Sequence, residues 1–421
     1  MTDSGADQTD AAGVADLVGL EWVVDVGKVA HGGHCVARHE GRVVFVRHTL
    51  PGERVRVRIT EGKATDRFLR GDAVEVLEAA PERVPALCPY AGPGRCGGCD
   101  FQHVDLAHQR VLKADVIREQ FHRLAGLDVS PTVEAVPGDV DGLRWRTRVE
   151  LAVDRSGRAG LRAHRSHDII PIDDCLIASE RVIETGVLDT VWTDCTAVDV
   201  VAADAPQDAV VVPIPESRVP RVGQRVETPT WSGSFELSAR GFWQVHPGAA
   251  ATYVEHVLEE LSPAPGERAL DLYAGVGLFA LALADAVGPE GAVLAIEADP
   301  RAVRDGSGNA QDHAQVEFRV GRVDRALKPL VRQGVLADVV VLDPPRTGAG
   351  KAVVADIAAL RPRAVAYVAC DPAALARDTA YLAAVGYSLR SLRAFDAFPM
   401  THHMECIAIF DAARGPDDVG P

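Results

Sequence analysis

Residues Ala364–Asp378 read AVAYVACDPAALARD. The apolar run Ala364–Ala369 predicts a buried β-strand. Asp371-Pro372 ends that strand and begins a helix, because proline suits a first helical turn. Cys370 therefore lies where a strand meets a helix, at the sheet edge where open α/β sheets bind ligands. A helix N-terminus also favours the thiolate, the nucleophilic form of cysteine. The alternative is a cysteine that only packs in the core.

The chain around this segment alternates strands and helices from about Gly233 onward, the pattern of a doubly wound parallel sheet. The strand Arg268–Tyr273 leads into the glycine turn 274–277 and a helix, an arrangement that brings a cofactor to a helix N-terminus. Glu297 ends the next strand, 22 positions after Gly275, and suits the hydroxyls of a ribose. These features would serve NAD as well as S-adenosylmethionine.

Two further acids favour S-adenosylmethionine. Asp271 precedes the glycine turn, where methyltransferases commonly place an acid near the cofactor. Asp343-Pro344-Pro345-Arg346 follows the strand Asp338–Leu342, and an acid before two prolines resembles enzymes that methylate a planar nitrogen or a nucleobase. We therefore expect methyl transfer in this half of the chain.

The composition limits the class of protein. With 421 residues the chain is expected to form two or three domains. The net charge of −16 argues against coating nucleic acid through bulk charge, although local arginine clusters leave room for an RNA enzyme. No apolar run is long enough to cross a bilayer, and Met1–Asp16 lacks the features of a signal peptide. We expect a cytoplasmic protein without a membrane partner, with a disordered leader at 1–17 and a tail at 413–421.

The segment 18–80 predicts a small β-barrel. Short β-rich stretches such as Arg42–Val46 and Arg54–Ile59 alternate with glycine-containing turns, which is typical of barrels of the OB type. The glycine-rich strand near Gly27–Val36, followed by Leu50-Pro51-Gly52-Glu53, resembles the TRAM domain, an RNA-binding barrel. That resemblance implies RNA delivery and not catalysis.

The segment 81–232 predicts a central β-rich domain with a cysteine cluster. Cys88, Cys96 and Cys99 lie within twelve residues, with glycines between them, and Cys175 is the best candidate for a fourth ligand. Four thiolates suit zinc or a [4Fe–4S] cluster, and spacing alone does not separate these. Free thiols without a metal are the remaining alternative.

The order of motifs over 233–412 resembles the RNA uracil-C5 methyltransferase family, which has the class I, Rossmann-like methyltransferase sheet. The barrel and the cysteines add the subgroup with TRAM and a [4Fe–4S] centre, which acts mostly on 23S ribosomal RNA. The motifs that carry the resemblance are Gly241-Phe242-Trp243-Gln244-Val245, the Asp271 turn, Asp343-Pro344-Pro345-Arg346, Ala369-Cys370-Asp371-Pro372 and Phe398-Pro399 with His403-Met404-Glu405. Asp371 stands where this family usually has asparagine.

The resemblance implies a role for each matched residue. Cys370 would add to C6 of uracil and activate C5, and Glu405 would then remove the C5 proton. Asp343 would lie near the cofactor and the uracil edge, and Gln244 would contact cofactor or base. Tyr273 would pack beside S-adenosylmethionine, on the turn that contains Gly275 and Gly277, and Glu297 would hold the ribose. Cys88, Cys96, Cys99 and Cys175 would hold the cluster, with zinc as the less favoured metal.

The main hypothesis is therefore an RNA 5-methyluridine methyltransferase. We expect a monomer that acts on a flipped-out uridine, with ribosomal RNA favoured over transfer RNA. One rival is a nucleobase N-methyltransferase that uses Asp343 directly and leaves Cys370 without a role. A second is a catalytically idle RNA-binding or ribosome-assembly factor, and an NAD enzyme ranks behind both.

Overall fold

The computed structural model describes residues 15–204, 208–215 and 218–413. The chain divides into two compact units. Unit 1 comprises the residues up to 116 together with 161–170 and 399–402, and unit 2 comprises the remaining residues from 117 onward. The expected leader and tail lie almost wholly outside the described residues, and the domain boundaries given above stay predictions.

Unit 1 contains the closed five-stranded barrel that the sequence predicted. Its strands follow the spatial order β1-β2-β3-β5-β4. Their bounds are β1 Glu21–Val29, β2 Cys35–His39, β3 Arg42–Arg47, β4 Arg54–Glu61 and β5 Phe68–Glu78. Alternate residues such as Val55, Val57 and Ile59 are buried, because successive side chains of a strand point to opposite faces. The arginines between them form ion pairs across the barrel surface, including Arg56 with Glu75 and Arg58 with Glu21.

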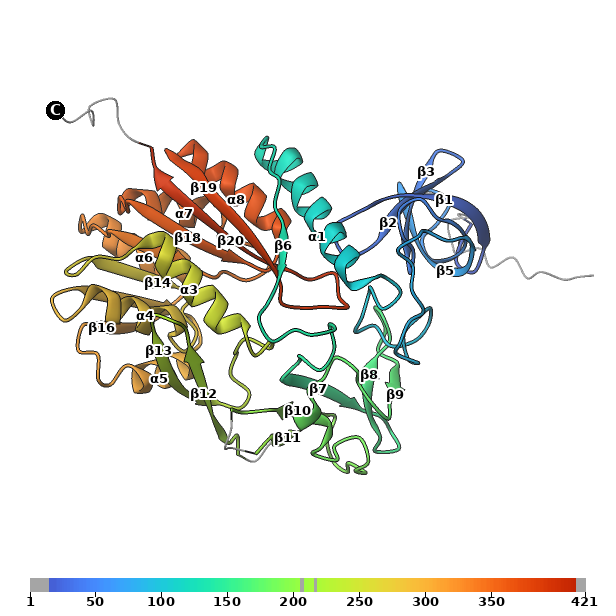
Figure 1. The fold of residues 1–421 in the computed structure, drawn as a ribbon, viewed down its shortest axis with the longest axis horizontal. Helices are drawn as coiled ribbons and strands as arrows, with labels where there is room; N and C mark the ends of the chain where they lie inside the picture. Colours follow the sequence, from blue (N-terminus) through green and yellow to red (C-terminus); the bar gives the residue numbers. More distant parts are fainter. Residues whose placement is uncertain (1–14, 205–207, 216–217, 414–421) are drawn as a thin grey trace, which may run out of the picture. The chain divides into compact units, whose positions relative to one another are not determined.

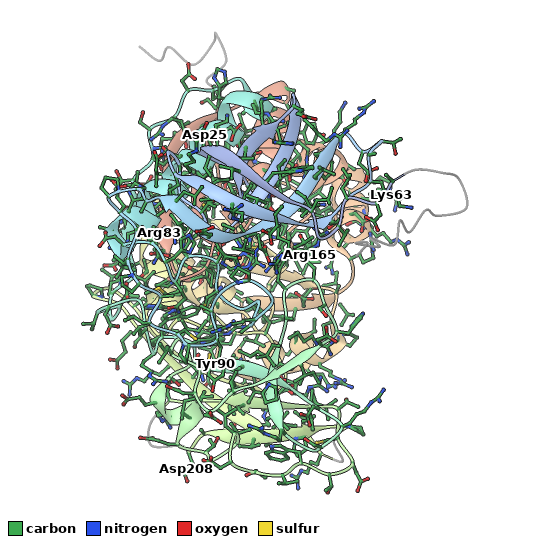
Figure 2. All side chains as sticks on the ribbon, turned by 90° about the vertical axis from the view of Figure 1, so that its right-hand side faces the viewer. Asp25, Lys63, Arg83, Tyr90, Arg165 and Asp208 are labelled. Atoms are coloured by element: carbon green, nitrogen blue, oxygen red, sulfur yellow. The ribbon has the colours of Figure 1, made fainter. Side chains whose placement is uncertain are left out.

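A buried carboxylate fixes the segment that follows the barrel. Both oxygens of Glu53 accept hydrogen bonds from Arg83, at 2.5 and 2.7 Å, and Arg83 is labelled in Figure 2. The backbone N–H groups of Leu50 and Ala80 donate to the same carboxylate. Four donors compensate for the loss of water around a buried charge. The cysteine-containing loop begins from this anchor.

The apolar periodicity of Gln102–Leu124 predicts one long helix, but the regular α-helix in this stretch is shorter. Helix α1 spans Leu106–Gln120, and a π-helical turn follows at Phe121–Ala125. Asp105 accepts hydrogen bonds from the N–H groups of Ala107 and His108, so it caps the start of α1. Gly126 ends the π turn in the left-handed conformation.

Unit 2 begins with β-rich structure. A sheet with the order β11-β10-β7-β8-β9 includes two strands, β10 and β11, in the stretch 193–220, whose sequence pattern is ambiguous. The second half of β8 and all of β9 except Pro171 belong to unit 1. The hairpin β12-β13 and the four-residue helix α2 complete this part. The bounds are α2 Glu180–Ile183, β7 Arg148–Val153, β8 Ala159–Arg162, β9 Ile169–Pro171, β10 Ala197–Val201, β11 Val210–Ile214, β12 Arg221–Glu227 and β13 Ser232–Ser238.

The rest of unit 2 is an eight-stranded sheet with helices on both faces, in the order β16-β15-β14-β17-β18-β20-β19-β6 (Figure 1). The five strands β16, β15, β14, β17 and β18 are parallel, which confirms the predicted doubly wound sheet, and β20 pairs antiparallel with β18 and with β19. The strands are β6 Val133–Ala135, β14 Arg268–Leu272, β15 Ala292–Glu297, β16 Val316–Val320, β17 Val339–Leu342, β18 Ala364–Ala369, β19 Tyr387–Asp396 and β20 Glu405–Ala412. The helices are α3 Ala249–Leu261, α4 Leu278–Val287, α5 Pro300–Asn309, α6 Val323–Arg332, α7 Gly350–Ala359 and α8 Pro372–Ala384.

Helices α3 and α4 pack together against one face of this sheet. The apolar residues of that face form one cluster with them, including Ala269, Val341, Val368 and Ile407. Because side chains alternate between faces along a strand, Asp271, Asp343 and Cys370 are directed to the same side as these residues. The sheet therefore brings polar groups to the edge of an apolar layer.

No helix in the described residues is long and apolar enough to cross a membrane.

Candidate active site

Strand register brings Cys370 and Glu405 together. The last pair between β18 and β20 is Ala369 with Cys406, so Cys370 and Glu405 occupy the next position at the sheet edge. Leu342 pairs with Tyr367, which places Asp343 level with Val368 on the neighbouring strand. Three residues that are far apart in the sequence thus meet at one corner of the sheet, as the motifs predicted.

The two carboxyl groups of this corner favour their protonated forms. Glu405 is only 4% exposed, and its Oε1 has no hydrogen-bond partner among the described residues. Burial raises the pKa of Glu405 well above its usual value, and the charge of Asp343 adds to this effect. Burial also raises the pKa of Asp343 to about 7. Two like charges in a poorly solvated site resist simultaneous ionisation, so the pair binds a proton readily near neutral pH.

The pKa of Cys370 is raised, whereas its position at a helix N-terminus suggested a lowered pKa. Burial raises its pKa to about 12, and the charges of Glu405 and Asp343 contribute in the same direction. Arg346 lowers this pKa, but by less than the other effects raise it. The helix N-terminus is present, since Asp371 accepts a hydrogen bond from the N–H of Ala374 at 2.8 Å and caps α8. The expectation that the helix end makes Cys370 a thiolate is therefore wrong for this state, and a base is needed to take its proton.

The glycine turn and the acid that follows it are directly connected. The N–H of Gly275 donates to Glu297 Oε2 over 3.0 Å, and the N–H of Asp299 donates to Oε1 of the same carboxylate over 2.8 Å. Tyr273 has a φ of 63° and donates its N–H to the carbonyl of Ile296. The predicted cofactor residues at the ends of β14 and β15 thus form one group.

Gly277 ends this turn and precedes α4. Its φ of 93° lies in the left-handed region that favours glycine. A Cβ atom built at Gly277 would lie 2.7 Å from Cζ of Phe318 on β16, closer than real Cβ contacts. Only glycine allows this turn to pack so closely against the sheet.

Asp271 lies beneath the turn, where burial makes its charge costly. It is 1% exposed, and a backbone hydrogen bond from Ala280 offsets only part of the effect of burial. Burial raises its pKa to about 8. This acid is costly to ionise in the free protein, which is typical of a functional position.

Gln244 lies in the lining of a cavity of unit 2. The cavity has a volume of about 370 Å³, and Trp243, Pro247 and Thr252 also line it. Tyr273, Glu297 and the residues of the glycine turn are not among those that line this cavity. Asp343, in contrast, is tied to the cofactor group, since its N–H donates to the carbonyl of Leu272 at 3.2 Å.

The cysteine cluster is not confirmed. Among the described residues, no three His, Cys, Asp or Glu side chains converge to hold a metal ion. Two of the sulfurs do accept hydrogen bonds, Cys96 from the N–H of Gly98 and Cys99 from the side-chain amide of Gln102. Cys88, Cys96 and Cys99 belong to unit 1, and Cys175 belongs to unit 2.

Sequence reasoning assigned no role to Tyr253. This residue is fully buried on α3, and the charges of Glu405, Asp343, Cys406 and Cys370 all raise its pKa. The one signal in the sequence was a hydroxyl on the apolar face of a helix, where Ala249, Ala250, Val254 and Val257 also lie.

Comparison with known proteins identifies related chains. A TRAM domain model matches residues 16–74, and a model described as tRNA (Uracil-5-)-methyltransferase matches residues 318–412. The chain is 48% identical to an uncharacterized RNA methyltransferase of Streptomyces avermitilis, over 94% of this chain and 100% of that protein. It is 31% identical to the 23S rRNA (uracil(1939)-C(5))-methyltransferase RlmD of Shewanella sp., over 92% of this chain and 95% of that protein.

The fold has a counterpart among solved structures. The Pyrococcus abyssi tRNA (uracil-54, C5)-methyltransferase, solved in complex with S-adenosyl-L-homocysteine, superimposes with a TM-score of 0.66 at 21% identity. The match covers 92% of this chain and 99% of that chain. The TRAM barrel, the methyltransferase sheet and the full-length relatives together show that this chain belongs to the RNA uracil-5-methyltransferase family and is one of its S-adenosylmethionine-dependent enzymes.

Proposed function

We propose that this enzyme methylates C5 of a uridine in 23S ribosomal RNA through a covalent adduct between Cys370 and C6 of the base. The observation that carries the proposal is the juxtaposition of Cys370 and Glu405 at one sheet edge, set by the register of β18 and β20. A nucleophile and a base on the same side of the sheet fit a reaction that needs both in succession.

The reaction needs these groups because C5 of uracil is a poor nucleophile. Addition of the Cys370 sulfur to C6 moves electron density onto C5 and the O4 oxygen. C5 then attacks the methyl group that S-adenosylmethionine supplies, and S-adenosylhomocysteine leaves. Glu405 removes the remaining C5 proton, the C5–C6 double bond forms again, and the C6–S bond breaks to release the thiolate.

The first step also requires a proton acceptor, since burial raises the pKa of Cys370 to about 12. Asp343 and Glu405 are the nearby carboxylates, and their raised pKa values make either one a better acceptor than an exposed carboxylate. We assign the thiol proton to Asp343, because Glu405 must stay ionised to take the C5 proton in the later step.

The cofactor would lie over the turn after β14. Glu297 would hold the ribose hydroxyls, Tyr273 would pack beside the cofactor, and Gly275 and Gly277 would allow its close approach. Asp271 and Asp343 would offer negative charge near the sulfonium. The hydrogen bond between Gly275 and Glu297 supports this arrangement, because it links the turn to the acid. Gln244 stays a candidate for contact with the base.

The choice of 23S ribosomal RNA follows the RlmD relative, which this chain matches over 95% of that protein. The TRAM match supports RNA binding by unit 1. A cavity of about 590 Å³ in unit 1 has four arginines in its lining, Arg47, Arg58, Arg70 and Arg165, and the rings of His34 and His164. Guanidinium groups beside rings suit phosphates and stacked bases.

The test is to trap the adduct with RNA that contains 5-fluorouridine, in the presence of S-adenosylmethionine. Fluorine at C5 cannot leave as a proton, so the enzyme should stay bound to the RNA through Cys370. Mass spectrometry of the peptide that contains Cys370 should find the cross-linked nucleotide, and C370A should abolish both adduct and turnover. C195A, which removes a cysteine distant in sequence, is the control and should behave as wild type.

The same variants separate the rival function. A nucleobase N-methyltransferase that uses Asp343 would keep its activity in C370A and would form no adduct. A wild-type enzyme that binds S-adenosylmethionine and methylates RNA without an adduct would overturn the covalent mechanism.

We also propose that Cys88, Cys96, Cys99 and Cys175 bind a [4Fe–4S] cluster, with zinc as the alternative metal. The thiolate donor set and the N–H groups directed at Cys96 and Cys99 support this proposal. We assign the cluster no step in methyl transfer. Anaerobic reconstitution with iron and sulfide, followed by metal and sulfide analysis, should yield a loaded protein, and C96S should lower the iron content. Zinc without sulfide in the native protein would decide for the alternative.

A further inference from the structure

The side chain of Tyr253 lies beneath the strand pair that contains Glu405. Its ring packs on Phe395 with a centroid distance of 5.8 Å. Phe395 is the direct partner of Glu405 in the antiparallel register of β19 and β20. Residues directly opposite in such a pair direct their side chains to the same face. Tyr253 on α3 therefore packs against the same face of this strand pair as Glu405, close enough for the charge of Glu405 to act on it.

The hydroxyl of Tyr253 is unusual among the buried tyrosines of unit 2. Tyr367 donates to Asp378 over 2.8 Å, and Tyr387 donates to the carbonyl of Pro362 over 2.7 Å. The Tyr253 hydroxyl has no partner among the described residues, and neither has Oε1 of Glu405. Buried polar groups are almost always hydrogen-bonded, so two unpaired groups on the same face of one strand pair require an explanation.

The chemistry of the two groups is complementary. Burial and the charges of Glu405, Asp343, Cys406 and Cys370 raise the pKa of Tyr253 well above its usual value, so its hydroxyl stays a neutral donor. A carboxylate is an acceptor only. A hydrogen bond between them would form when Glu405 is ionised.

Other charged and titratable groups surround Glu405 on the neighbouring elements. Asp343 after β17, Cys370 and Asp371 after β18, and Cys406 on β20 interact electrostatically at this corner. Arg346 is the positive charge that lowers the pKa of Cys370. Arg393 on β19 and His256 on α3 lie against the ring of Phe395, the residue opposite Glu405, and Asp396 follows Phe395 in the chain.

We propose that Tyr253 is a positioning residue that donates a hydrogen bond to the Glu405 carboxylate in the step that removes the C5 proton. The inference rests on the proposed function, because it assigns Tyr253 to the base of that mechanism. Tyr253 does not touch the uracil. It holds the carboxylate in its ionised form and orients it, so that the proton passes from C5 to Glu405 while the C6–S bond breaks.

The consequence can be measured, because elimination and methyl transfer are separate steps. Without the hydroxyl, the ionised form of Glu405 loses a donor and forms only at higher pH. In Y253F the methylated adduct should therefore accumulate on ordinary uridine RNA near neutral pH. Product release should slow about tenfold at pH 7 and recover toward pH 9, which corresponds to a shift of about one pH unit in the acid limb.

The experiment is a single-turnover assay of wild type, Y253F and the control Y387F from pH 6 to pH 9. It follows labelled methyl in RNA, covalent complex and released product separately. We expect Y253F to transfer methyl at the wild-type rate, to form the 5-fluorouridine adduct normally, and to release product slowly. Y387F also loses a buried hydroxyl, but at the opposite end of the β19–β20 pair, where Tyr387 faces Ala412 and donates to a backbone carbonyl, so it should keep the wild-type pH profile.

Several outcomes would overturn the inference. An unchanged pH profile and release rate in Y253F, with a normal wild-type adduct, would reject the role of Tyr253 and leave the proposed function intact. The absence of any wild-type adduct would reject both. The double variant Y253F/E405Q tests the link directly, since Y253F should add nothing to E405Q if it acts through that carboxyl, whereas additive effects would contradict the inference.

Discussion

At the residue scale, Cys370 shows what a local pattern can and cannot predict. A strand, a cysteine and Asp-Pro are local features, so they fixed the position of the thiol at the sheet edge. The acidity of the thiol depends on Asp343 and Glu405, which approach it only in the folded sheet. Their charges and the burial of the corner reverse the effect expected from the helix end. The position of Cys370 could be predicted from the sequence, whereas the direction of its pKa shift required the three-dimensional structure.

Asp371 gives a prediction at this scale, because it both caps α8 and adds negative charge beside Cys370. In D371N the asparagine still caps the helix, since asparagine and aspartate cap about equally well. The lost charge should lower the pKa of Cys370 and speed its alkylation about threefold at pH 9, which corresponds to about half a pH unit. Timed iodoacetamide labelling with peptide mass spectrometry measures this rate.

Cys195 provides the internal standard in the same experiment, because Asp194 is the charged group that acts on it. Its labelling rate should not change in D371N. E405Q should accelerate Cys370 more than D371N does, since Glu405 contributes the larger effect. Equal rates in wild type and both variants would show that these charges do not control the thiol.

At the element scale, long and strongly patterned segments were the most predictable. The apolar periodicity of Ala249–Leu261 predicts a helix, and α3 has these bounds; the turn between β14 and α4 lies where the glycines indicated. Two of the elements that were not foreseen show why. The three-residue strand β6 is too short to have a pattern of its own and depends on pairing with β19, and the π-helical turn after α1 continues an unbroken apolar periodicity.

The glycine turn allows a matched pair of variants, because Gly275 and Gly277 both have positive φ but differ in their surroundings. G275A meets no atom within 4 Å and should cost about 1–2 kcal/mol of unfolding free energy, the strain of a left-handed alanine. G277A adds a clash with the Phe318 ring and should cost about 3 kcal/mol or more. Urea unfolding measures both values.

The same pair should differ in cofactor binding. The methyl of G275A projects into open space at the turn where we place the cofactor, so this variant should fold well yet bind S-adenosylmethionine less tightly by calorimetry. A stable G275A with wild-type affinity would argue against the proposed position of the cofactor, whatever the result for G277A.

At the scale of the whole molecule, the classes of fold were predictable, but the grouping of segments that are remote in sequence was not. The barrel and the doubly wound sheet follow from repeated strand and helix patterns. The stretches 161–170 and 399–402, however, group with the residues of unit 1. Hydrogen bonds fix the second stretch, since Asp100 and Phe101 both donate their N–H groups to the carbonyl of Met400. Pairings between residues about 300 positions apart leave no mark on a local pattern.

The stability of the molecule should fall as pH rises from about 4 to 8, because buried carboxyl groups tolerate the neutral form and resist the charged one. Burial raises the pKa of Asp271 to about 8 and that of Asp343 to about 7, and Glu405 shifts in the same direction. The folded state then binds more protons than the unfolded chain over this range. The free energy of unfolding is therefore highest at low pH with respect to these groups and declines through their folded pKa values.

D271N tests this effect at Asp271, whose pKa burial raises to about 8, since asparagine is neutral at every pH and close in shape to aspartate. Between pH 5 and pH 8 the wild type should lose about 3–4 kcal/mol more unfolding free energy than D271N, as one pKa unit corresponds to about 1.4 kcal/mol. Urea unfolding at four pH values measures the difference, and D312N, an exposed aspartate of unit 2, is the control. If D271N merely shifts the curve by a constant amount, Asp271 is not the group that titrates. A flatter curve in D271N, together with weaker S-adenosylmethionine binding, would explain why the chain keeps a destabilising carboxylate beneath the turn: its charge is costly in the free enzyme and favourable beside a sulfonium cation.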